Sequence, residues 1–229
     1  LGLGNAGDPV TFHAVHLLEI SARGRPIRAA APKEPRRVNL LPLINPVRDA
    51  VVGTWTMREG SLVSDSTGEF PPQGRGGARL QIPYKPPEEY DLRVSFTRLS
   101  GLHCVAVLFP MNGETLTFIA GGYDNRLAGF EMVNGHGSRV GQNPTTVHRN
   151  GWLTNQRQEL VLQVRKRQAR VLLDGSEIMR SPDNYAGMST AVWYRLNDGA
   201  LPGIGSWASP MAFHVIELTE ISGTGSPVR

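Results

Sequence analysis

The feature that most constrains this chain is a long-period internal repeat. Residues 1–26 align without a gap with residues 202–227, at a constant offset of 201, and eleven of the 26 positions are identical. The shared phrase reads FHAVHLLEIS near the start and FHVIELTEIS near the end. A repeat of this period sets the number of domains, because each copy belongs to its own structural unit. We therefore expect residues 1–26 to be the final strands of a preceding repeat.

Between the two copies, the hydrophobic pattern is that of β-strands. Apolar and polar residues alternate through YDLRVSFTR (90–98), as in a strand with one buried face. Asn112-Gly113 and Asp174-Gly175 separate strand-like runs, and such pairs favour two-residue hairpin turns because both residues need a positive φ. No stretch of 12 or more residues keeps a helical period. Further strands are predicted over 104–110, 159–166, 169–178, 189–196, 203–207 and 213–221.

About a dozen short strands at this spacing predict an all-β fold, an antiparallel two-sheet jelly-roll sandwich. The predicted order is the final strands of a preceding repeat (1–26), a basic Pro/Ala/Arg linker (27–39), the jelly-roll domain (40–222) and a tail (223–229). We expect residues 23–38 to add nothing to the core. An unpaired N-terminal strand is an aggregation hazard. We therefore expect the strand around Phe12 to pair with a sheet edge, in its own domain or in a neighbouring chain.

The positive charge of the chain is local. The net charge is +4, but residues 22–38 hold six basic residues and one acidic residue, whereas the remainder holds 18 basic and 19 acidic residues. A nucleic-acid-binding domain usually carries its basic patch on the fold, so this distribution argues against nucleic acid as a partner. The basic stretch is typical of a solvated connector, with contact to an acidic surface or polyanion as the alternative.

Two further observations limit the class of protein. No apolar run reaches the roughly 20 residues that a membrane-spanning helix needs. Cys104 is the single cysteine, so the chain has no internal disulfide and its redox compartment stays open. Because Cys104 begins the apolar run CVAVLFP, we expect a buried, packed thiol.

Four phrases of the sequence resemble known families. LLPLINPVRDAVVGTW (40–55) and TMREGSLVSDS (56–66) resemble the opening strands of the 3-keto-disaccharide hydrolase domain family. QELVLQVRKRQARVLLDGSEI (158–178) and GIGSWASPMAFHVIELTEI (203–221) resemble a hairpin and the last strand of laminin-G-like and concanavalin-like folds. The resemblance implies a concanavalin-like jelly roll that occurs as a tandem repeat in a larger bacterial protein. The loop INPVRD (44–49) departs from the Asn-Gly-Lys-like phrase of the family, so the resemblance carries no ligand role for this loop.

One group of acidic residues resembles the start of a glycosidase motif. Glu89 and Asp91 stand two apart on a predicted strand, but Arg93 or Val94 occupies the place of a further glutamate. Glycoside hydrolysis needs two carboxyl groups about 5–9.5 Å apart. We therefore interpret Glu89, Asp91 and Arg93 as a salt-bridged solvent face.

Asp124 and Glu131 form a second candidate pair. Seven residues of continuous strand would hold them about 23 Å apart and on opposite faces. They are therefore no catalytic pair unless a turn at Gly129 brings them together, although either could bond a ligand hydroxyl.

The histidines give no metal or catalytic pattern. His136 and His148 lie in a Gly/Asn/Thr-rich loop without a partner at metal-ligand spacing. His13 and His214 occupy equivalent repeat positions, so a shared structural role is expected. The sequence predicts no catalytic residue, no bound metal and no cofactor.

Aromatic residues mark a candidate sugar-binding face. Trp193 and Tyr194 are adjacent on a predicted strand, so one of the two rings should leave the core. Rings at a sheet edge can stack against sugars, although packing in the core or at its rim is the alternative for each. The candidate ligand-binding residues are Trp193, Tyr194, Arg195, Tyr123, Asp124 and Trp152.

These observations favour a non-catalytic module of a multidomain protein, which binds carbohydrate or another protein. One alternative is an enzyme of the glycoside or keto-sugar hydrolase type. The other is the repeat unit of a self-assembling surface or filament protein, with neighbouring repeats or the N-terminal strand as contacts. The sequence leaves the compartment open, with an extracellular or cell-surface location slightly favoured.

Overall fold

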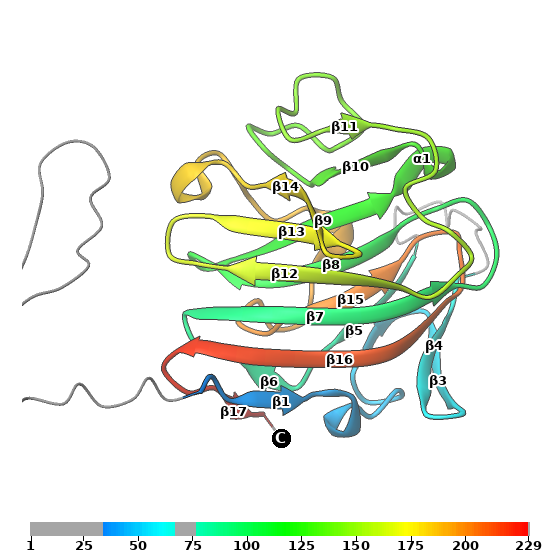
Figure 1. Cartoon of the computed structure of the whole chain (residues 1–229), viewed down its shortest axis with the longest axis vertical. Helices are drawn as coiled ribbons and strands as arrows, with labels where there is room; N and C mark the ends of the chain where they lie inside the picture. Colours follow the sequence, from blue (N-terminus) through cyan, green and yellow to red (C-terminus); the bar gives the residue numbers. More distant parts are fainter. Residues whose placement is uncertain (1–33, 67–76, 229) are drawn as a thin grey trace, which may run out of the picture. The chain divides into compact units, whose positions relative to one another are not determined.

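The computed structural model describes residues 34–66 and 77–228. Nearly all the described residues belong to one compact unit, which begins at residue 35. In the described part this unit consists of antiparallel strands β1–β17, three short 3-10 turns and the four-residue helix α1 (Gly122–Asn125). Figure 1 shows that most of the chain is drawn as strands. None of the helices in these ranges has the length and apolar character needed to cross a membrane.

Eight strands form the first large sheet, called sheet A. Its order is β14-β13-β12-β7-β16-β4-β3, and β1 pairs with β16 beside this path. The longest strands, β7 and β16, lie at its centre and pair along most of their length. The strands of sheet A are β1 (Arg37–Asn39), β3 (Thr54–Arg58), β4 (Ser61–Asp65), β7 (Glu89–Arg98), β12 (Gln158–Val164), β13 (Ala169–Leu173), β14 (Ser176–Arg180) and β16 (Met211–Ser222).

Seven strands form the second large sheet, called sheet B, in the order β11-β10-β9-β8-β15-β5-β2. A separate two-stranded sheet joins β6 (Tyr84–Lys85) to β17 (Ser226–Pro227). The strands of sheet B are β2 (Ala50–Val52), β5 (Ala78–Gln81), β8 (Val105–Met111), β9 (Glu114–Gly121), β10 (Leu127–Phe130), β11 (Val147–His148) and β15 (Gly203–Ser206).

The main core lies between the two large sheets. Phe96 of β7 and Phe213 of β16 come from sheet A, Phe109 and Phe118 come from sheet B, and all four are fully buried in one hydrophobic cluster. The predicted alternation of β7 is confirmed, because its apolar side chains are buried while Asp91, Arg93 and Thr97 keep contact with solvent. The buried apolar residues of β7 are Tyr90, Leu92, Val94 and Phe96. The jelly-roll prediction is thus confirmed.

Both predicted hairpin turns are also confirmed. Asn112 and Gly113 join β8 to β9 with φ angles of 53° and 81°. Asp174 and Gly175 join β13 to β14 with φ angles of 50° and 79°. Both turns thus use two consecutive positive φ values, the type I′ geometry whose twist matches that of the flanking strands.

The predicted strand over 189–196 is wrong. In its place the chain forms a single 3-10 turn, η3 (Val192–Tyr194), in which Tyr194 N–H bonds to the carbonyl of Ala191 at 2.8 Å. The run is apolar because Ala191, Tyr194 and Leu196 pack on the outer face of sheet B. Periodicity reports burial, and a covering segment can be buried without being a strand.

The sheets also include residues on both sides of 40–222. β1 lies inside the predicted linker and pairs with β16 through the register Val38↔Leu218. Val38 packs against the main core, which corrects the expectation that residues 23–38 add nothing to it. The physical reason lies in the hydrogen bonding of β16. β4 pairs only with the first residues of β16, and β1 pairs with the backbone groups farther along the same edge. β17 lies in the predicted tail.

Many residues that are identical in the two repeat copies lie at positions of 202–227 where the packing leaves little room for change. A Cβ atom on Gly203 or Gly205 would lie 2.8 Å from a backbone oxygen of β5, so neither site has room for a side chain. Phe213 and Leu218 are fully buried in the main core. Glu220 is also buried and accepts a hydrogen bond from the Tyr84 hydroxyl at 2.6 Å.

His214, another identity, joins three strands. Its Nδ1 is 2.9 Å from Ser61 Oγ of β4, and its Nε2 is 2.9 Å from Thr97 Oγ1 of β7. Burial lowers the pKa of His214, with Arg157 adding to the effect. These contacts describe a structural role for His214. The equivalent His13 and the predicted N-terminal strand around Phe12 lie outside the described residues.

Candidate functional site

The outer face of sheet B carries a second hydrophobic cluster. Along β8, Val105, Val107 and Phe109 point into the main core. Ala106 and Leu108, which alternate with them, point outward. The segment around η3 covers this outer face, and part of it stays open as a pocket of about 260 Å³. The pocket is lined by His103, Cys104, Ile119, Tyr123, Glu131, Arg139, Trp193, Tyr194 and Trp207.

Aromatic rings form much of the pocket wall. Tyr123 is 37% exposed and belongs to α1, where its φ of 48° places it in a left-handed turn after Gly121. Its ring centroid lies 5.5 Å from that of His103 and 5.2 Å from the guanidinium carbon of Arg139. Tyr194 and Trp207 meet edge to face at 6.1 Å. Such faces bind apolar sugar faces or cations.

Glu131 places a carboxylate at the wall of this pocket. It follows β10, whose pairing with β9 continues through the bond from Glu131 N–H to the Thr117 carbonyl at 2.8 Å. Glu131 is buried, with 4% of the residue exposed. Its carboxylate accepts hydrogen bonds from the backbone N–H and the hydroxyl of Ser138. Burial raises the pKa of Glu131, and these two bonds offset part of the effect.

His103 and Cys104 lie where the chain enters β8. Nδ1 of His103 is buried and has no hydrogen-bond partner among the described residues. Burial lowers the pKa of His103, and the nearby Asp124 opposes this shift. Burial raises the pKa of Cys104 to about 12, and its Sγ lies 3.4 Å from the Tyr194 hydroxyl. The buried, packed thiol that the sequence predicts is confirmed, and its raised pKa disfavours the reactive thiolate.

Three of the six candidate sugar-face residues line the pocket: Trp193, Tyr194 and Tyr123. Of the adjacent pair, Tyr194 is 3% exposed and Trp193 is half-buried. One ring therefore does leave the core, although the chain forms a turn here instead of a strand.

The other three candidates lie elsewhere. Asp124 and Arg195 are exposed and do not line the pocket. Trp152 is buried in the main core with the Arg149 guanidinium carbon 4.1 Å from its ring centroid. The chain between Asp124 and Glu131 turns at α1, while Gly129 lies within β10.

Apart from Ile119 on β9, sequence reasoning missed four lining residues: His103, Arg139, Trp207 and Cys104 as a pocket residue. They come from three separate loops, and no spacing in the sequence connects them. Glu131 was selected as one half of a pair with Asp124, with a bond to a ligand hydroxyl as the alternative role of either residue. The sequence does contain a signal for Glu131. The residue directly follows the strand-like run LAGF, and the alternation of side chains along that strand favours the outer face for Glu131.

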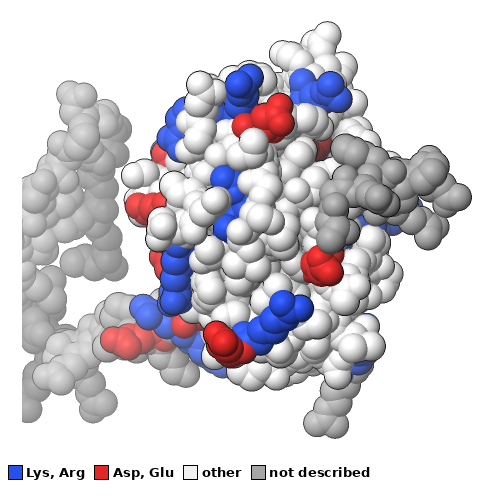
Figure 2. All heavy atoms as spheres, turned by 90° about the vertical axis from the view of Figure 1, so that its right-hand side faces the viewer, with Lys and Arg blue, Asp and Glu red and all other residues white. Residues whose placement is uncertain are grey.

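The predicted salt-bridged face of β7 is confirmed for Asp91 and Arg93, whereas Glu89 accepts a hydrogen bond from the backbone N–H of Lys166 at 3.0 Å and is in no ion pair with a described residue. Arg165 bonds to Asp91 at 2.7 Å, and Arg93 bridges Glu159 and Glu217 at 3.0 and 3.4 Å. The cation that pairs with Asp91 is therefore Arg165 and not Arg93. Figure 2 shows acidic and basic side chains scattered over one face of the molecule, without a large basic patch on its uncovered part.

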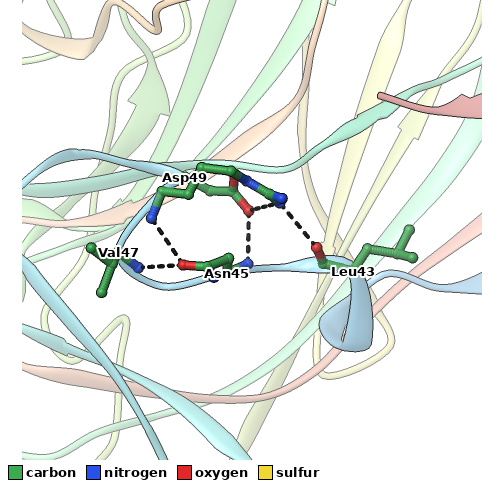
Figure 3. A network of polar contacts seen from close by, with 5 residues as sticks. Leu43, Asn45, Val47 and Asp49 are labelled. Carbon is green, nitrogen blue, oxygen red and sulfur yellow. Dashed lines mark hydrogen bonds and ion pairs between the residues drawn. The ribbon is translucent and has the colours of Figure 1, made fainter. Parts of the chain in front are cut away.

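The loop INPVRD closes on itself. Asn45 Oδ1 accepts hydrogen bonds from the backbone N–H groups of Val47 and Arg48 at 3.0 and 2.9 Å. Asp49 Oδ2 accepts from Asn45 N–H at 2.8 Å and from the Arg48 guanidinium at 2.8 Å (Figure 3). The polar groups of this loop are therefore used within the turn that leads into β2.

A larger groove of about 540 Å³ lies between the segment 85–88, the β8–β9 turn and residues 199–200. Its lining includes three prolines and no aromatic side chain. The pocket beside Glu131 is smaller but combines rings, a buried carboxylate and an imidazole, which is the composition of a ligand site. Neither here nor elsewhere in residues 34–66 and 77–228 do three His, Cys, Asp or Glu side chains form a metal-binding group.

Comparison with known proteins supports the fold. No protein-family model matches the chain, and no curated protein matches its sequence. Among solved structures, a Crh5 transglycosylase in complex with NAG superposes with a TM-score of 0.54 at 8% identity, over 82% of this chain and 85% of that one. The carbohydrate-binding module CBM66 from Bacillus subtilis gives 0.49 at 12% identity, over 73% and 92%.

The galectin LEC-6 from Caenorhabditis elegans gives a TM-score of 0.39 at 11% identity, over 64% of this chain and 91% of that one. At such identities the likeness concerns the fold. The sheet topology defines the described domain as an antiparallel two-sheet jelly-roll sandwich, and the superposition on the Crh5 transglycosylase agrees with that fold.

Proposed function

We propose that the described domain is a non-catalytic carbohydrate-binding module and that its sugar occupies the pocket on the outer face of sheet B. One observation carries the proposal: the pocket places the rings of Tyr123 and Trp193 beside the buried carboxylate of Glu131. An aromatic ring packs against the C–H face of a sugar, and a buried acceptor fixes the orientation of its hydroxyls. His103 and Arg139 add polar groups from two other loops.

The enzyme alternative has less support. Glu131 is the one carboxylate among the residues that line the pocket. Glycoside hydrolysis by the usual route needs a second carboxyl group about 5–9.5 Å away. Asp124 is close enough to His103 to influence its pKa, but its side chain is exposed and outside the lining. Binding therefore accounts for the pocket better than hydrolysis does.

We further propose that the module occurs as a repeat in a multidomain protein. The eleven identities between residues 1–26 and 202–227 support this, because many of them fall on residues that the described copy needs for folding. A link to the 3-keto-disaccharide hydrolase family rests on the sequence phrases alone. A self-assembling repeat is the competing proposal, and a mass by light scattering that grows with concentration would favour it.

A glycan-array screen tests the binding proposal. The wild-type chain would be compared with Tyr123→Ala and Trp193→Ala, and Val192→Ala serves as the matched control. Val192 is 64% exposed, lies next to Trp193 and does not line the pocket. Loss of a stacked ring typically costs about 1–1.5 kcal/mol, so we expect binding to fall about tenfold in both ring variants and to persist in the control.

Two results would count against the proposal. One is silence of the wild-type protein across the array while circular dichroism reports an intact β-fold. The other is binding that survives both ring substitutions unchanged, which would place the sugar at another surface.

A further inference from the structure

Among residues 34–66 and 77–228, the carboxylate of Glu131 has no cationic partner. None of the ion pairs between described residues includes it, and the two hydrogen bonds that it accepts within this part of the chain both come from Ser138. Buried charges in proteins are normally paired, because an isolated charge away from water is costly. Each carboxylate oxygen can accept about two hydrogen bonds, so acceptor capacity also remains. Glu131 therefore offers a carboxylate without a described cationic partner, and with free acceptor positions, at the wall of a pocket.

The indole of Trp193 lies beside this carboxylate. A methyl group built on Gly137 would lie 3.2 Å from Glu131 Oε2 and 3.5 Å from Trp193 Cζ2. The two groups thus approach the same point from different segments of the chain. An anion next to an aromatic ring is the combination that attracts an ammonium group, through charge and through the ring quadrupole.

The other charged or titratable groups of the pocket leave this position open. Arg139 is exposed, and its guanidinium lies over the ring of Tyr123 at 5.2 Å. His103 is largely neutral near neutral pH because burial lowers its pKa. The Cys104 thiol and the Tyr194 hydroxyl are protonated in the same range, since burial raises the pKa of each.

We infer that the pocket takes an amino sugar, a hexose with a free amine, whose ammonium group binds Glu131 while its ring packs against Trp193. This inference rests on the proposed function and names the ligand class. A neutral hydroxyl would also bond to Glu131, but only a cation compensates the buried charge. An N-acetylated amine carries no charge, so its amide would leave that charge unbalanced.

Isothermal titration calorimetry with defined sugars near neutral pH tests the inference. Glucosamine would be compared with glucose, N-acetylglucosamine and ethanolamine, on the wild-type chain, Glu131→Gln and Glu159→Gln. Glutamine preserves the shape of Glu131 and removes its charge. Glu159 lies on the outer face of sheet A, in an ion pair with Arg93, and serves as the control for the same substitution.

We expect glucosamine to bind wild type and Glu159→Gln about tenfold more tightly than glucose or N-acetylglucosamine, and Glu131→Gln to lose this preference. If neutral sugars bind as tightly as glucosamine, the inference is wrong and the proposed function stands. Ethanolamine binding as tightly as glucosamine would mean that the site reads the ammonium alone, and the amino-sugar assignment would fail. If no sugar binds, the proposed function itself fails.

Discussion

Among the ionisable side chains around the pocket, Cys104 and Glu131 are buried and His103 is partly buried. In each case burial is the largest cause of the pKa shift, and it favours the neutral form. For Glu131 the two hydrogen bonds from Ser138 act in the opposite direction. The folded protein thus carries a cost in stability at this residue, which is a common property of binding sites.

Replacing Glu131 with glutamine should make the protein more stable near neutral pH. Because the pKa of Glu131 is raised in the folded state, its proton contributes stability that is fully present below the unfolded pKa. That contribution is lost as the pH rises through the folded pKa. Thermal unfolding should therefore show a higher melting temperature for Glu131→Gln at about pH 7, and a smaller difference at about pH 4. An equal difference at both pH values would contradict this account.

At the scale of elements, β15 depends on the absence of side chains. It lies between β5 and β8, and a Cβ on Gly205 would lie 2.8 Å from the Ala78 carbonyl oxygen and 3.6 Å from Ala106 Cβ. The first distance is shorter than real Cβ contacts, and the obstacle is backbone, which cannot rotate away. The glycine pattern of GIGS is therefore a requirement of strand packing, and it recurs in GLG near the start of the chain.

Gly205→Ala should destabilise the domain by about 1–3 kcal/mol, the usual cost of overpacking a closely packed site. Urea unfolding followed by tryptophan fluorescence gives the measurement. Gly141→Ala is the matched control, because a Cβ at Gly141 meets nothing within 4 Å and its φ is not in the left-handed region. Equal urea midpoints for the two variants would show that β15 can shift to admit the methyl group.

At the scale of the whole molecule, β16 connects distant parts of the chain. It pairs with β7, β4 and β1, and its bond from Met211 N–H to Ser64 Oγ joins residues 147 positions apart. Most of the sheet pairings outside the hairpins are likewise non-local. Each such contact must be closed against chain entropy before it stabilises anything.

Refolding should therefore be slow for a protein of this size, in the range of milliseconds to seconds or longer. Stopped-flow dilution from urea, monitored by the buried Trp55 and Trp152, would record the rate. Complete refolding within microseconds would contradict the topology, since only folds dominated by local contacts reach that range.

Much of the fold could be predicted from local sequence. The hairpins at Asn112-Gly113 and Asp174-Gly175 follow from backbone preferences of neighbouring residues, and the strand 90–98 follows from alternation. The site could be predicted only in part. Trp193, Tyr194 and Tyr123 were proposed because they are aromatic, but the same reasoning selected Trp152, which lies in the main core.

The sequence by itself determined the class of fold, because strand periodicity and turn chemistry act between residues that are close along the chain. Only the tertiary structure decided that 189–196 is a covering turn, that Val38 joins the core, and that Glu131 lies near Trp193. These outcomes depend on how segments such as the one around η3 pack against the sheets. The free energy of that choice comes from contacts between residues far apart in sequence, which no local pattern encodes.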